Sequence, residues 1–171
     1  QRKRKIPDMS INAWRFAACS LFAIVVLYFF PEHWFPEIFI AKKSLLLSAA
    51  FIYFYLLTII LGMLFKILPF LSYTHLQQRC LTNFDTMKFL PNMNDLLNKK
   101  AARILFYCHI FTGGSLMLTV LSPQFYWFFS GLLMVEFSLF FTVILKTCLV
   151  YQRSLFKIKQ VESTVVDVSA V

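Results

Sequence analysis

Charged residues are scarce in this chain of 171 residues: they make up 15% of it, whereas soluble domains contain about 25%. Hydrophobic residues make up 59%, and the mean hydropathy is +0.68. A water-soluble fold of this size cannot hide so much apolar surface. The composition therefore argues against a soluble domain and predicts that the chain lies in a lipid bilayer.

The sequence also lacks the motifs of soluble enzymes. It has no phosphate-binding P-loop, no Gly-x-Ser-x-Gly elbow and no His-Glu-x-x-His zinc motif. The four cysteines are scattered, and no histidine or second acid stands beside Asp85 or Asp95, as a metal site would need. We therefore expect a non-enzymatic protein without a metal site, and no disulfide, because all four cysteines fall in the cytoplasmic half of the expected topology.

Four long apolar segments predict four membrane-spanning helices. They cover about residues 13–30, 44–65, 101–121 and 125–146, near the roughly 20 residues that a helix needs to cross the hydrocarbon. Residues 51–60 have no polar face at the helical period, which argues against a soluble helical bundle. We expect an all-α, polytopic membrane protein with one domain, an antiparallel bundle of four helices. The first segment has no small-residue cleavage pattern, so we interpret it as an uncleaved anchor.

Lysine and arginine are concentrated on one side of this topology. Five lie in residues 1–15, six between residues 66 and 103, and four after residue 145; the first outer loop has two and the second none. The positive-inside rule therefore places both termini, the loop 66–100 and the tail 147–171 in the cytoplasm. A bacterial inner membrane and a eukaryotic endomembrane would both give this pattern.

The basic residues closest to the membrane predict contact with anionic lipid headgroups, at about 1 kcal/mol per charge. The run 2–5 also resembles a nucleic-acid or nuclear localisation signal, but its place just before a membrane helix favours lipid, and we expect no nucleic acid partner. An acidic protein is the second candidate partner. We assign the headgroup role to Arg2, Lys3, Arg4, Lys5, Lys99, Lys100 and Arg103.

The start of the third helix has a recognisable signal. Pro91 interrupts the preceding segment, and Asn92 or Asn94 can then cap a helix, with Asp95 favourable in its first turn. We expect the helix to begin near Asp95 and to continue into the membrane without a break.

Glu136 is the residue whose position most needs an explanation. It lies near the middle of the fourth segment, where an acidic side chain costs roughly 2.5–3.5 kcal/mol on insertion scales. Small and hydroxylated residues lie on nearly the opposite face of the same helix. Since small residues favour close helix contact, we expect that face to meet one neighbouring helix, and Glu136 to face another helix or a partner subunit. The candidate helix-packing residues on this face are Gly131, Ser138 and Thr142, and those on the third segment are Gly113 and Gly114.

His109 is the best candidate partner for Glu136 within the chain. At 1.5 Å per residue, both lie within about 5 Å of the bilayer midplane on its inner side. The interpretation that we favour is a single interhelical hydrogen bond that fixes register, about 0.6 kcal/mol on average. The alternative is a proton or cation relay.

Haem is a further hypothesis that the histidines raise. His75 and His109 both belong to the inner side, and the pair Gly113-Gly114 could admit a flat ring. Membrane cytochromes with several haems need more histidines than the three present, so we expect no cofactor.

These observations predict a non-enzymatic integral membrane subunit of a larger assembly, which contributes packing, anchoring and partner recruitment. Other membrane subunits and membrane lipids are the expected partners. The alternative is a small transporter or channel in which Glu136 and His109 handle protons or cations.

Overall fold

The computed structural model describes residues 9–81 and 84–169, and the chain is helical almost throughout them. Four helical stretches of this part are long and apolar enough to cross a membrane, so the predicted all-helical chain with four candidate spans is confirmed at this level. The long helices are α1 (Met9–Phe29), α2 (Glu37–Ala50), α3 (Thr58–Cys80), α5 (Lys99–Leu121) and α6 (Tyr126–Ser169).

Short helices make the connections. Three of them are 3₁₀ helices: η1 (Glu32–Trp34), η3 (Phe84–Phe89) and η4 (Pro123–Phe125). A four-residue helix, α4 (Met93–Leu96), precedes α5. A π-helix, η2 (Phe51–Leu57), joins α2 to α3, so that Glu37–Cys80 is one continuous helix of 44 residues.

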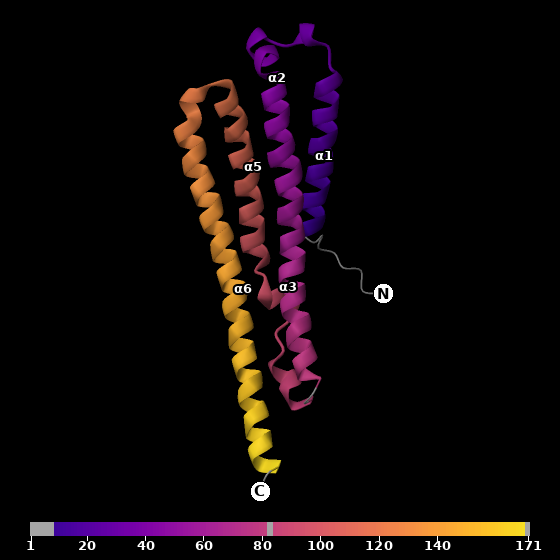
Figure 1. The fold of residues 1–171 in the computed structure, drawn as a ribbon, viewed down its shortest axis with the longest axis vertical. Helices are drawn as coiled ribbons and strands as arrows, with labels where there is room; N and C mark the ends of the chain where they lie inside the picture. The colour runs from indigo at the N-terminus through magenta and orange to yellow at the C-terminus, as the bar shows by residue number, and fades with distance from the viewer. Residues whose placement is uncertain (1–8, 82–83, 170–171) are drawn as a thin grey trace.

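The long helices lie side by side with similar axes (Figure 1). α1 packs along α3 and η2, α5 lies between α2 and α6, and α6 also touches α3. α3 and α6 both continue well past the start of α1, with η3 and α4 beside them. The chain therefore has a part built from all the long helices and a narrower part built mainly from two.

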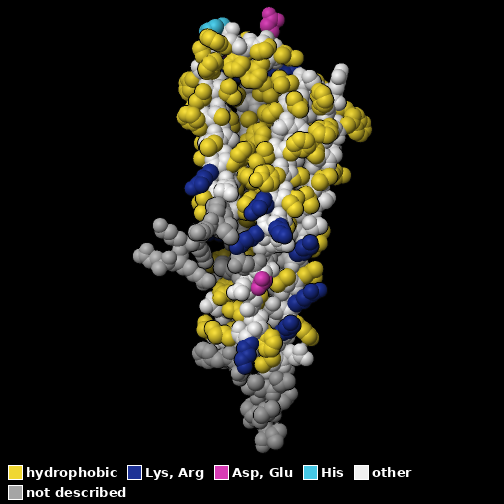
Figure 2. Space-filling view, turned by 180° about the vertical axis from the view of Figure 1, so that it is seen from behind, with side chains coloured by type: hydrophobic (Ala, Val, Ile, Leu, Met, Phe, Trp, Pro, Cys, Tyr) yellow, Lys and Arg dark blue, Asp and Glu magenta, His cyan; other side chains and the backbone are white. Residues whose placement is uncertain are grey.

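Side-chain chemistry divides the molecule at the same level. We call one part of the molecule the apolar end. It extends from the turns at 30–36 and 122–125 to the level of four basic residues, Arg15, Lys66, Arg103 and Lys146. The rest, with the later turns of α3 and α6, η3 and α4, is the basic end. On the face drawn in Figure 2, hydrophobic side chains cover most of the apolar end, and most of the visible lysines and arginines lie at its lower limit and below it.

The apolar end exposes large hydrophobic side chains that water does not tolerate in such numbers. Phe22 is 71% exposed and Phe137 is 63% exposed, and they lie on different helices. A contiguous apolar surface of this extent is typical of contact with lipid or with another protein.

Small residues bring α1 close to α3. Ser10, Ala13 and Ala17 are buried on one face of α1, and a Cβ added at Gly62 of α3 would lie 3.0 Å from Ala13 Cβ. Gly62 is thus a close-packing position that the sequence analysis missed. The spacing of Ala13 and Ala17, which is typical of tight membrane helix pairs, was the available signal.

The helices on the basic side differ from the prediction. The predicted apolar spans end at residues 65 and 146, but α3 continues to Cys80 and α6 to Ser169. Parts of the segments 66–100 and 147–171 are therefore helical, and their cytoplasmic side stays a prediction. The physical reason is a small hydrophobic core between α3 and α6, in which Leu76, Cys80 and Ile158 are fully buried. Hydropathy located the apolar turns of each helix but not the amphipathic turns that follow.

The predicted continuous start of the third helix is wrong. A helix does begin close to Asp95: it starts at Met93, and the Asp95 carboxylate in its first turn accepts a hydrogen bond from the Asn92 backbone N–H at 3.3 Å. That helix is α4, which ends at Leu96, and α5 begins anew at Lys99. Asn98 lies between them in an extended conformation and accepts a hydrogen bond from the Lys100 N–H at 2.9 Å, so it caps the second start.

Candidate functional site

Four polar side chains form one buried cluster inside the apolar end. They are Tyr53 from η2, Thr58 from α3, His109 from α5 and Glu136 from α6. His109 and Thr58 are fully buried, and Tyr53 and Glu136 are nearly so. We call these four residues the polar cluster; it joins three of the four candidate spans.

Glu136 is hydrogen-bonded through both carboxylate oxygens. Its Oε1 lies 2.7 Å from His109 Nδ1, and its Oε2 accepts a hydrogen bond from the Tyr53 hydroxyl. His109 Nε2 lies 3.0 Å from Thr58 Oγ1. The Tyr53 ring stacks on the His109 ring, with centroids 4.5 Å apart and planes 13° apart. The structure thus brings together the predicted pair His109 and Glu136 and adds two partners.

The π-helical turn puts Tyr53 in position. A π-helix shifts the register of the residues that follow it, and such turns are often found at functional sites. The altered turn also changes the partners of its carbonyls. The Ser20 hydroxyl on α1 donates a hydrogen bond to the Phe54 carbonyl oxygen, with 3.0 Å between the oxygens. Thr58 Oγ1 lies 3.5 Å from the Tyr53 carbonyl oxygen.

Gly113 on α5 leaves room for the same turn. A Cβ at this position would lie 2.4 Å from Phe54 Cε1 and 2.9 Å from Tyr53 Cδ1. No side chain fits there without moving both rings. The absence of a side chain at Gly113 therefore allows Tyr53 to reach His109 and Glu136.

The hydrogen-bond pattern permits two arrangements of one proton. If His109 is an imidazolium, both ring nitrogens donate, one to Glu136 and the other to Thr58, whose own hydroxyl then points to the Tyr53 carbonyl. If Glu136 is protonated instead, it donates to Nδ1 and the Nε2–H again donates to Thr58. Both arrangements are neutral overall, which is the state that a low-dielectric environment favours.

The other predicted packing residues lie apart from the cluster. A Cβ at Gly114 or Gly131 would meet no atom within 4 Å, so neither is a close-packing position within this chain. Ser138 and Thr142 are exposed, and their hydroxyls donate to carbonyls of α6 itself, to Met134 and Leu139 at 2.7 Å. The expected helix contact of this face is not made by any described helix of the chain; of the predicted glycines, only Gly113 lies at a close contact.

The two histidines considered for haem lie in different ends. His75 is in the basic end and bonds Tyr151, with 2.7 Å between Nδ1 and the hydroxyl. His109 has a partner at both ring nitrogens. Across residues 9–81 and 84–169, no group of three or more His, Cys, Asp or Glu side chains is arranged to hold a metal ion.

The predicted headgroup residues are described only in part. Lys99, Lys100 and Arg103 are exposed at the start of α5, at the junction of the two ends. Arg2, Lys3, Arg4 and Lys5 lie outside the described residues.

Lys42 has a structural role that the sequence analysis missed. Its ammonium group donates to the carbonyl oxygens of Val120 and Leu121, both at 2.8 Å. These carbonyls belong to the last turn of α5, where a cation is favourable because the helix dipole is negative there. Lys42 therefore ties α2 to the far end of α5.

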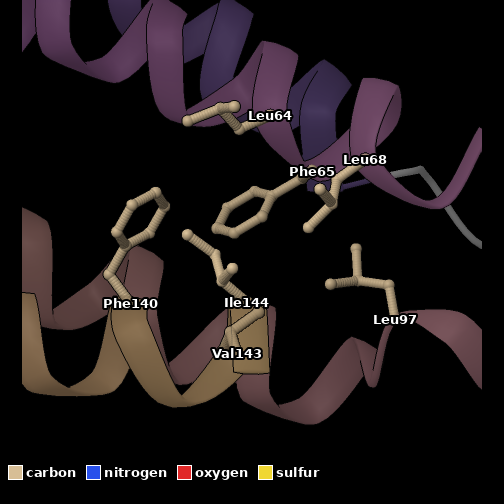
Figure 3. Close-up of a pocket in the computed structure, with 7 residues that line it drawn as sticks. All are labelled: Leu64, Phe65, Leu68, Leu97, Phe140, Val143 and Ile144. Atoms are coloured by element: carbon tan, nitrogen blue, oxygen red, sulfur yellow. The ribbon is translucent and has the colours of Figure 1, made fainter. Parts of the chain in front are cut away.

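A narrow apolar groove opens between α3 and α6 (Figure 3). Leu64, Phe65 and Leu68 approach it from α3 and face side chains of α6, and Leu97 closes one end. All the lining side chains are hydrocarbon, and none belongs to the polar cluster. The groove offers no polar group with which to orient a ligand. Its lining residues are Leu64, Phe65, Leu68, Leu97, Phe140, Val143 and Ile144.

Tyr53 and Thr58 were not foreseen as site residues. Both stand in an apolar run with other aromatic and hydroxylated residues, and nothing local separates Tyr53 from Tyr55. Only the π-helical register, together with the space that Gly113 leaves beside Tyr53, distinguishes Tyr53 from Tyr55.

Comparison of the chain with protein-family models, with curated proteins and with solved structures finds no match.

Proposed function

We propose that this chain is a non-enzymatic integral membrane subunit, an antiparallel bundle of four spanning helices with both termini on the cytoplasmic side. The division into an apolar end and a basic end supports this topology. Most lysines and arginines lie at the border between the two ends or in the basic end, as the positive-inside rule expects of the cytoplasmic side. The function is to pack against, anchor and recruit other membrane subunits.

The observation that carries the proposal is that α6 has two different faces, one buried within the chain and one uncovered. Its buried face holds Glu136, and both carboxylate oxygens are engaged by side chains of the same chain. Its opposite face, with Gly131, Ser138 and Thr142, is left uncovered. Small residues on an uncovered membrane face suit the close approach of another helix. The inner face thus stabilises the subunit, and the outer face is free to bind a neighbour.

The alternative, a small transporter or channel, would use the same pair of residues. A neutral pair that shares one proton is suited to proton handling in chemical terms. Transport also needs that pair to exchange with water, and in the described part its polar atoms are hydrogen-bonded within the polar cluster. We therefore favour the subunit.

The test is to enlarge the small residues of the outer face. In the Gly131→Leu and Ser138→Leu variants we expect the chain to insert and fold, because both positions are exposed, but to lose its co-purifying neighbours. Mild detergent extraction, native electrophoresis and mass spectrometry of the co-isolated chains provide the measurement. Ala23→Leu, which enlarges an exposed small residue on α1, is the matched control and should keep the assembly.

An assembly of unchanged mass and composition in both α6 variants would refute the proposal. So would an equal loss of neighbours in the Ala23→Leu control, since the effect would then not belong to the outer face of α6.

A further inference from the structure

α6 carries a regular uncovered stripe that runs through both ends of the molecule. Its positions recur at alternating steps of four and three residues, the spacing of a coiled-coil seam. All of them are exposed, and they lie opposite the buried face that holds Glu136, Thr147 and Ile158. We call them the outer stripe: Gly131, Val135, Ser138, Thr142, Leu145, Leu149, Gln152 and Phe156.

Five of the eight stripe residues are chemically unsuited to the solvent expected at their level. In the apolar end, where lipid favours large hydrocarbon side chains, it contains Gly131, Ser138 and Thr142. In the basic end, where water favours charge, it contains Leu149 and Phe156, the latter 69% exposed. An exposed phenylalanine outside the apolar end is more informative than one within it. A single helix packed along the whole stripe would cover both mismatches.

Charges beside the stripe specify the chemistry of such a helix. Lys146 follows Leu145 and Arg153 follows Gln152, at positions that flank a coiled-coil seam, and both are exposed. Residues 146–161 contain no acidic residue. A second copy of α6 packed in parallel would set like charges against each other, whereas acidic residues on another helix would complement them.

On the basis of the proposed function, we infer that the outer stripe of α6 binds a helix of a different chain that crosses the membrane beside it and continues past it. That helix carries apolar residues at the same alternating spacing opposite Leu149 and Phe156. Acidic residues flank them opposite Lys146 and Arg153. The stripe recurs about every 3.5 residues, slightly less than the roughly 3.6 residues of one α-helical turn. This difference predicts that the two helices form a left-handed supercoil.

Site-directed photo-cross-linking in the native membrane tests this inference. The probe is p-benzoylphenylalanine, placed at Phe156 of the full chain, and at Gln78 as the control. Gln78 is an exposed residue of α3 in the basic end, away from the stripe. Cross-linked peptides are sequenced by mass spectrometry. We expect the Phe156 probe to label a segment of another chain that has apolar residues at the stripe spacing and Asp or Glu beside them, and the Gln78 probe not to label that segment.

A charge variant adds a second readout. Arg153→Glu should lower the yield of that cross-link by about tenfold, because a like charge then faces the acidic flank. Arg153→Lys keeps the charge and should keep the yield.

Several results would overturn the inference: labelling of lipid alone, no adduct, labelling of a second copy of this chain, or labelling of a segment without acidic residues. If the Gly131→Leu and Ser138→Leu variants lose their neighbours while the Phe156 probe gives one of these results, the proposed function stands and this inference fails. If those variants keep the assembly, the proposed function fails as well.

Discussion

Two histidine hydrogen bonds of the same length, 2.7 Å, lie in opposite ends of the molecule and in opposite surroundings. His109 meets Glu136 in the apolar end, where both are buried and Tyr53 and Thr58 complete the cluster. His75 meets Tyr151 in the basic end, where the bond is exposed. Next to it, the two long helices bury Leu76, Cys80 and Ile158.

In the proposed arrangement, with the apolar end in lipid and the basic end in water, the difference reflects what holds helices together in each solvent. Lipid tails are as apolar as leucine, so burying hydrocarbon adds little there, and close packing and interhelical hydrogen bonds select the arrangement. Water drives apolar side chains together, so a small hydrocarbon core is sufficient in the basic end. The polar cluster therefore helps to specify the apolar end, and the small core of Leu76, Cys80 and Ile158 helps to hold the basic end.

Removing the carboxylate of Glu136 should have the largest effect on stability. In Glu136→Leu, the Tyr53 hydroxyl and the His109 imidazole lose their buried partner, and we expect the free energy of unfolding to fall by about 2–4 kcal/mol. Unfolding of the isolated chain in detergent, followed by circular dichroism, measures the change.

The matching change in the basic end is Tyr151→Phe, which removes the bond to His75. We expect its effect to stay within about 0.5 kcal/mol, because the bond is exposed to solvent. Equal losses in the two variants would contradict the comparison between the two ends.

A smaller loss should come from filling the notch on α5. The Cβ of Gly113→Ala would collide with Phe54 and Tyr53, and overpacking of this kind costs about 1–3 kcal/mol. The same assay serves for this variant. Gly114→Ala is the matched control, because the next residue on the same helix has open space beside it and should tolerate the methyl group. The prediction fails if the two variants unfold alike.

Much of the frame follows from one-dimensional patterns. Runs of apolar residues locate four candidate spans, and helix rise alone predicts that His109 and Glu136 lie at the same level. The continuation of α3 and α6 was missed, because those turns are stabilised by packing against each other around Ile158. The break at Asn98 was missed because two caps stand six residues apart, and only the packed chain shows that both are used.

The cluster shows the same limit. Glu136 attracted attention because an acid in an apolar run is costly, whereas Tyr53 did not, because a tyrosine there is ordinary. Its role depends on the π-helical turn, which is read from no local motif and which needs Gly113 from another helix. Burial by distant residues decides such sites, and a single sequence does not record it.

The central claim is that α6 passes from lipid into water, and two similarly exposed phenylalanines on it provide the direct test. Phe137 lies in the apolar end and Phe156 in the basic end, at 63% and 69% exposure. Spin labels at these positions, in the isolated chain reconstituted in bilayers without its native cysteines, report collision with oxygen, which concentrates in lipid, and with a water-soluble nickel complex. We predict that the label at 137 collides mainly with oxygen and the label at 156 mainly with nickel. Two labels with the same preference would contradict the account.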